Sequence, residues 1–121
     1  MSSQSLKDVI AASPIARLHG LRPGQDGTSV ELVATVQETG ANGRVNETAL
    51  TLVLLAASHA VYTGSSIISF TVHPTPTKAS VGDLLVGTAR IDAEQEGSAK
   101  ISATVKVGDQ LIASAEIHRR R

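Results

Sequence analysis

Residues 46–64 read NETALTLVLLAASHAVYTG, and this stretch decides the fold. Asn46 is a good N-cap residue, because its side-chain oxygen can accept from a free backbone N–H of the first helical turn. Glu47 follows, where the helix dipole favours a negative charge, and Gly64 stands where a left-handed C-terminal cap is expected. The sequence therefore predicts one helix over Asn46–Val61. Its polar interruptions between Ala49 and Val61 are Thr51, Ser58 and His59.

A helix that is apolar nearly all round should be buried on most sides. The apolar run is nevertheless too short to cross a membrane, which needs about 20 residues. This helix is thus expected to form the core of a domain that the rest of the chain wraps.

The segments around the helix alternate apolar and polar residues with the period of β-strands. The predicted strands are Ile15–Leu21, Thr28–Val36, Ser66–His73, Asp83–Ile91, Ser98–Val107 and Gln110–His118, the last with Leu111, Ala113, Ala115 and Ile117 facing inward. The last four strands are expected to form a meander, with a hairpin turn at Gly108-Asp109. Pro74 and Pro76 should end their strand or confine it to a sheet edge. A short helix is predicted over Ser5–Ala12.

These elements predict an α+β fold in which one antiparallel sheet of about five or six strands wraps a single long helix. The apolar face of the sheet must be covered, and only one element is apolar enough to cover it. The length of 121 residues fits a single domain over residues 1–121.

Composition limits the classes of function. The chain has 11 basic and 11 acidic residues and only two aromatic ones, Tyr62 and Phe70, which disfavours a nucleic-acid binder. It has no cysteine, which excludes disulfides and thiol catalysis. The N-terminal segment has no apolar signal-peptide core, so a cytoplasmic location without membrane attachment is expected. The only basic cluster, Arg119–Arg121, is expected to be a solvated tail.

The arrangement resembles the hotdog fold, and the sequence is similar to the PaaI-like acyl-CoA thioesterases over nearly the whole chain. The residues that carry the resemblance are the Ser13–Leu21 opening, the loop Gly40–Val45 before the helix, the tract Ser69–Val86 with Pro74, Pro76 and Gly82-Asp83-Leu84, and the final pair Ala99–Val107 and Gln110–Ile117. The resemblance implies hydrolysis of acyl-CoA thioesters, with coenzyme A as part of the substrate and no separate cofactor. It also implies a homodimer with two sheets joined edge to edge, or a tetramer.

The helix departs from the family pattern. Such thioesterases usually carry His-Gly-Gly at the helix start and an acidic residue about two turns later. That carboxylate activates water or attacks the thioester carbonyl, while an N–H near the helix start polarises the carbonyl. Here the start reads Asn46-Glu47-Thr48, and the acidic position falls on Leu54 or Leu55.

Three residues are candidates for a relocated catalytic centre. Glu47 is the only acid on the helix and is either a general base or a dipole-stabilising first-turn residue. Asn46 could orient the thioester carbonyl as well as cap the helix. His73, at a strand end before the two prolines, is either a catalytic base or a surface histidine of an edge strand.

Two further residues are candidates for binding. His59, four residues after Leu55, either projects near the same site or is a satisfied core or dimer-interface histidine. Lys78, in the loop after Pro76, is the best candidate to meet a phosphate of coenzyme A. The spacing of His, Asp and Glu suggests no metal site.

The sequence leaves three functions open. The first is an acyl-CoA thioesterase with an atypical catalytic centre. The second is a non-catalytic acyl or acyl-CoA binding protein, and the third is a structural homodimer.

Overall fold

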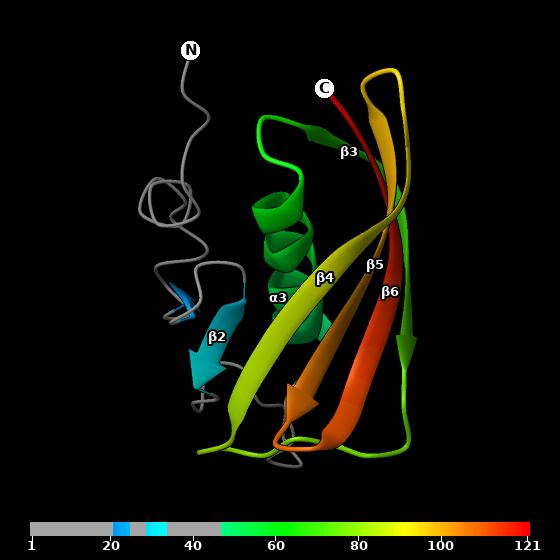
Figure 1. Ribbon diagram of the computed structural model, residues 1–121. Helices are drawn as coiled ribbons and strands as arrows, with labels where there is room; N and C mark the ends of the chain where they lie inside the picture. Colours follow the sequence, from blue (N-terminus) through cyan, green and yellow to red (C-terminus); the bar gives the residue numbers. More distant parts are fainter. Residues whose placement is uncertain (1–20, 25–28, 34–46) are drawn as a thin grey trace.

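The computed structural model describes residues 21–24, 29–33 and 47–121 (Figure 1). One helix, α3 (Glu47–Val61), lies against one six-stranded antiparallel sheet. The strands are β1 (Arg22–Pro23), β2 (Val30–Val33), β3 (Ser66–Pro74), β4 (Leu84–Gln95), β5 (Ser98–Val107) and β6 (Gln110–Arg120). The predicted combination of one long helix and one antiparallel sheet is confirmed. The predicted helix over Ser5–Ala12 lies outside the described residues.

The predicted first strand lies almost wholly outside the described residues. The described part of the predicted strand Ile15–Leu21 is Leu21 alone, which precedes β1 and is buried. The short strand β1 follows, and its Pro23 pairs with Val30 in β2. Proline is compatible with this position because β1 is an edge strand, where a missing N–H breaks no inner ladder.

The strand order β1-β2-β4-β5-β6-β3 corrects the predicted meander. Strands β4, β5 and β6 do form one, but β3 pairs with β6 at the far edge instead of with β4. A direct β3–β4 hairpin would need a tight turn, whereas Pro74 and Pro76 open a longer connection between the two strands. The prolines therefore leave β3 at a sheet edge. The sequence predicted that they would either end this strand or confine it to an edge.

Two-residue turns join the meander. Val107 pairs with Gln110 across the predicted Gly108-Asp109 turn, and Gly108 has a φ of 58°. Gln95 pairs with Ser98 across a second turn, Glu96-Gly97, where φ is 42° and 83°. Positive φ at both central residues, as in the Glu96-Gly97 turn, is the geometry of a type I′ hairpin.

The helix packs mainly over β4 and β5. Leu50, Val53, Leu54 and Ala57 are at most 5% exposed, and no side chain from Ala49 to Val61 is fully exposed, which confirms the predicted burial on most sides. At Gly87 of β4 an added Cβ would lie 2.4 Å from Cγ1 of Val53. Glycine at this position lets the helix approach the sheet closely.

The inward-facing residues of β6 follow the prediction from Ala113 onward. Ala113, Ala115 and Ile117 are buried, but Leu111 is 37% exposed and Ile112 is buried instead. The pairing shifts between Val105–Ala113 and Lys106–Leu111, which places Ile112 as an extra residue in β6. Because side chains alternate with period two, one extra residue turns Leu111 to the other side.

Within the described ranges, no helix is long and apolar enough to cross a membrane. The cytoplasmic location remains a prediction.

Candidate functional site

The inner face of β3, defined by Ile67, Phe70 and Val72, is left open beside the helix. These residues pair with Arg119, Ile117 and Ala115 of β6, whose side chains are buried on the helix side of the sheet. The helix lies over the middle of the sheet and makes few contacts with β3, which runs along the far edge (Figure 1). Phe70 is therefore 45% exposed and Ile67 38%. Apolar side chains exposed together on an edge strand typically mark a binding surface.

A stripe of α3 faces the same side of the sheet. Thr51, Leu55 and Ser58 are spaced by four and three residues, so they lie above one another on the helix. Ser58 receives a hydrogen bond from Nη1 of Arg119 on β6, at 2.9 Å, which fixes the direction of the stripe towards β6. Leu55 is half-buried on this stripe, whereas Leu54 is fully buried in the core. The helix carries no acidic residue after Glu47.

Of Asn46, Glu47 and His73, the three residues predicted for catalysis, His73 is the one whose side chain the structure describes. Asn46 lies outside the described residues. Glu47 is the first residue of α3, and its side chain is not among those described. His73 is exposed and pairs with Ser114, on the face of the sheet turned away from α3. Within one chain, the structure does not bring His73 to the helix side.

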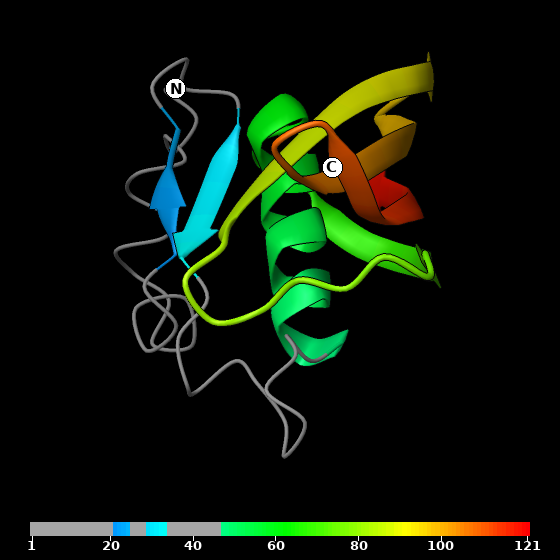
Figure 2. The ribbon, with the colours of Figure 1, turned by 90° about the horizontal axis from the view of Figure 1, so that it is seen from below.

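Lys78 lies at the end of the molecule where the helix begins. It is exposed in the connection between β3 and β4, next to the buried Ala79. Seen from below, this connection crosses the end of the molecule at which α3 starts (Figure 2). Thr75 anchors it by donating its backbone N–H to the carbonyl of Ile112, at 3.0 Å. Lys78 and the helix start therefore lie at the same end of the fold.

His59 lies at the opposite end of the helix, in contact with Arg119. The Arg119 side chain is only 5% exposed. Its Nε donates to Oγ of Ser65 at 2.7 Å, its Nη2 donates to the carbonyl of Ser65 at 2.9 Å, and Nη2 lies 3.3 Å from Nδ1 of His59. A guanidinium has no acceptor, so Nδ1 of His59 accepts and the ring hydrogen sits on Nε2. We call Arg119, Ser58, His59 and Ser65 the Arg119 cluster.

Electrostatics keeps this histidine neutral. Burial, and next the positive charge of Arg119, lower the pKa of His59 below its ordinary value. Burial also lowers the pKa of Arg119. Among the described residues no carboxylate contacts Arg119. Its charge is instead compensated by the carbonyl groups and the negative dipole end at the C-terminus of α3.

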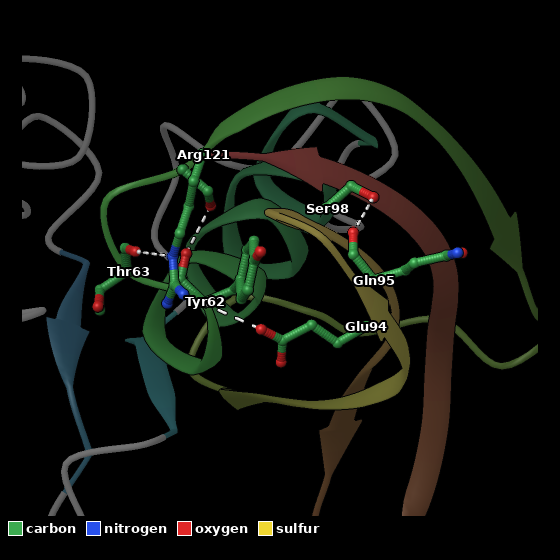
Figure 3. A network of polar contacts seen from close by, with 7 residues as sticks. Tyr62, Thr63, Glu94, Gln95, Ser98 and Arg121 are labelled. Carbon is green, nitrogen blue, oxygen red and sulfur yellow. Dashed lines mark hydrogen bonds and ion pairs between the residues drawn. The ribbon is translucent and has the colours of Figure 1, made fainter.

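The C-terminal arginines are not the solvated tail that the sequence predicted. β6 extends to Arg120, Arg119 is buried, and Arg121 lies over the ring of Tyr62 with its guanidinium carbon 4.0 Å from the ring centroid. Arg121 also donates from Nε to the carbonyl of Thr63, and its Nη1 lies 4.0 Å from the Glu94 carboxylate (Figure 3). The prediction failed because the helix end supplies acceptors and an aromatic face that only the fold brings to these arginines.

The Arg119 cluster could have been found from one sequence feature. His59, Ser58 and Ser65 are polar residues at the end of an otherwise apolar helix, and buried polar groups require partners. Nε2 of His59 and the hydroxyl of Tyr62 are buried without a hydrogen-bond partner among the described residues. No group of three described His, Asp or Glu residues could hold a metal ion.

Comparison with solved structures identifies the fold. Neither the models of known protein families nor the curated proteins give a match. The PaaI protein of the phenylacetic acid degradation operon of E. coli superimposes with a TM-score of 0.77 and 12% identity, over 93% of this chain and 87% of that one.

Two similar structures contain coenzyme A. The BH2602 protein from Bacillus halodurans with CoA has a TM-score of 0.76 and 14% identity, over 90% of this chain and 76% of that one. A hypothetical thioesterase from Streptococcus pneumoniae with coenzyme A has a TM-score of 0.70 and 8% identity, over 76% of this chain and 77% of that one. At such identities the likeness shows the fold, and the described chain has the hotdog fold.

Proposed function

We propose that this hotdog chain binds acyl-CoA thioesters beside α3 and hydrolyses them with an atypical catalytic centre. The observation that carries the proposal is the open, apolar inner face of β3 next to the Leu55 side of the helix, in a fold whose similar structures include two with coenzyme A. An acyl group needs apolar walls, and a few polar groups must orient its thioester. Phe70 and Leu55 provide such walls.

The start of the helix provides the polar groups of the proposed centre. Free backbone N–H groups there carry the positive end of the dipole and can polarise a thioester carbonyl. Glu47, the only acid on the helix, acts as the general base that activates water, and Asn46 orients the carbonyl. Lys78 meets a phosphate of coenzyme A from the loop at the same end. His73 was the other candidate base in the sequence, but it lies on the face of the sheet turned away from α3, so Glu47 is preferred.

A homodimer completes the proposed site. The outer edge of β3 has no strand neighbour in the described sheet, so its backbone groups can pair with a second copy. Pairing of two β3 edges would cover the exposed Ile67 and Phe70 and place two sites at the subunit boundary. A pair of such dimers would form a tetramer. We propose the cytoplasm as the location.

Release of thiol from a panel of short, long and aromatic acyl-CoAs tests the proposal. The chain has no cysteine, so a thiol-reactive dye reports product without a protein background. Glu47→Gln should lower kcat about 100-fold or more, the usual contribution of a general base. Glu116→Gln is the matched control, because it removes the same charge from the exposed outer face of β6. This variant should leave the rate unchanged.

His73→Ala decides between the two bases. A rate that collapses in His73→Ala but survives in Glu47→Gln would assign the base to His73. Turnover unaffected by either change would remove both assignments.

A non-catalytic binding protein is the second candidate, because the Thr51–Leu55–Ser58 stripe carries no acid. It predicts saturable acyl-CoA binding in calorimetry without thiol release. A structural dimer predicts neither binding nor release.

A further inference from the structure

A hollow on the outer face of the sheet is not used by the proposed function. It has a volume of about 420 Å³ and lies where β4 turns into β5, against the end of β6 and Ile68 of β3. Volumes of this size are typical of small-molecule sites. The hollow lies across the sheet from α3, so it is separate from the inner face of β3.

Two β-bulges flank this hollow. The β3–β6 pairing shifts between Ile67 and Ser69, which leaves Ile68 as an extra residue, 54% exposed at the rim. The β4–β5 pairing shifts between Ile91 and Ala93, and Ala93 lines the hollow from the other side. Bulges bend strands and redirect side chains, and they occur often beside functional sites. Here they give the hollow two apolar walls.

Basic side chains line the floor. Lys100 of β5 lies directly opposite His118 of β6, and Arg120 follows two residues later on the same exposed face. None of these three has a hydrogen bond or ion pair from its side chain to another described residue. Arg120 opposes Ser98 and is thus a diagonal neighbour of Lys100, so an anion between these two positive charges would relieve their repulsion.

The remaining charged residues do not neutralise this floor. Among the described residues, Glu94 is the one acid that lines the hollow, and its carboxylate lies near Arg121 (Figure 3). Arg119 contributes to the lining, but its guanidinium is bonded on the helix side of the sheet. The floor therefore keeps the two fixed positive charges of Lys100 and Arg120.

We propose that this hollow binds a small phosphate ester with an apolar body. Arg120 can hold two phosphate oxygens at once with its planar fork, and Lys100 adds a compact positive charge. His118, opposite Lys100 and two residues before Arg120, can donate a further hydrogen bond. The apolar body of the ligand lies against Ile68 at the rim.

Phenyl phosphate is the first probe, with inorganic phosphate and benzoate as comparisons, titrated against the full chain in calorimetry. The double variant Lys100→Gln/Arg120→Gln should weaken phenyl phosphate at least about tenfold, as expected for loss of charge-assisted hydrogen bonds. The matched control is Lys106→Gln/Arg90→Gln, which removes the same charge from the same outer face away from the hollow, and it should keep the affinity within about twofold.

Further measurements test the apolar part and the phosphate part of the site separately. Ile68→Ser should weaken phenyl phosphate but leave inorganic phosphate unchanged. Benzoate that binds as tightly as phenyl phosphate would overturn the phosphate assignment. Absence of saturable phosphate binding, or an equal loss in the control double variant, would overturn the site.

Thiol release measured in the same variants tests whether this phosphate site is separate from the proposed thioesterase site. Lys100→Gln/Arg120→Gln should leave KM for acyl-CoA unchanged, because the hollow lies on the other face of the sheet. A raised KM would contradict a separate site, since the hollow would then hold part of coenzyme A.

Discussion

Arg119 is a charged side chain that the fold buries among hydroxyl groups, a carbonyl and a neutral imidazole instead of beside a carboxylate. Its planar guanidinium points donors in several fixed directions at once, and each contact uses one of them. A lysine ammonium in the same place has three donors on a flexible stem and cannot reproduce this geometry. The cluster thus depends on arginine and not only on positive charge.

Arg119→Lys should lower the free energy of unfolding by about 2 kcal/mol, because charge-assisted hydrogen bonds are lost in a buried place. Arg120→Lys is the adjacent control on the exposed face and should change it by less than about 0.5 kcal/mol. Urea denaturation of both variants measures the difference. Equal effects of the two substitutions would show that the Arg119 contacts contribute nothing specific.

His59 should make stability depend on pH. Its pKa is lowered in the folded chain, so the unfolded chain binds a proton more readily. The stability that neutral His59 contributes is fully present above the ordinary pKa of about 6.5. This stability is lost as the pH falls from there through the lowered pKa of the folded chain. Wild type should therefore lose stability relative to His59→Gln as the pH falls from about 7 to about 5, while the two curves run parallel above about pH 7. Urea midpoints across this range test it, and parallel curves throughout would contradict it.

The close packing of α3 against β4 depends on the missing side chain at Gly87. Alanine there would place its Cβ against Val53, in a core where both elements are already buried. Gly87→Ala should therefore destabilise the fold by about 1–3 kcal/mol, as overpacking does. Val53→Ala in the same chain removes the clashing methyl groups and should make the added cost of Gly87→Ala smaller. A double-mutant cycle measures this coupling, and strictly additive effects would argue against the close approach.

Strand β3 should form the interface of the proposed dimer. Phe70→Glu places a charge on its exposed inner face and should shift the chain to a monomer with little loss of folded stability. Leu111→Glu changes a similarly exposed apolar residue outside β3 and should leave the dimer intact. Sedimentation velocity at several concentrations separates the two outcomes. A wild-type monomer, or a Phe70→Glu dimer, would remove β3 as the interface.

For the molecule as a whole, local patterns predicted the elements well. The apolar run after Glu47 and the alternation in Ser98–Val107 correspond to α3 and β5 almost residue for residue. Long-range pairing was not predictable in the same way. The alternating pattern indicates that β3 has one apolar and one polar face. It does not indicate that β6 is the neighbouring strand, because strand pairing and register depend on contacts between residues distant in sequence.

The sites were less predictable than the fold. Arg119 has no local signal of burial, since its partners come from the end of α3 and from Ser65, 54 to 61 residues earlier in the chain. The bulges at Ile68 and Ile112 are single extra residues in strands that still alternate on either side. His73 and Glu47 were both plausible bases in the sequence, and its pattern did not show that His73 faces away from α3.

Titration of the wild-type chain with a non-hydrolysable thioether analogue of a short acyl-CoA tests the central claim most directly. Calorimetry gives the stoichiometry, and amide chemical shifts of the labelled chain give the place of binding. We expect one saturable site per chain, with shifts at the start of α3, on the inner face of β3 and in the loop that contains Lys78. No binding with this analogue or with its long-chain and aromatic counterparts, or shifts away from these segments, would contradict it.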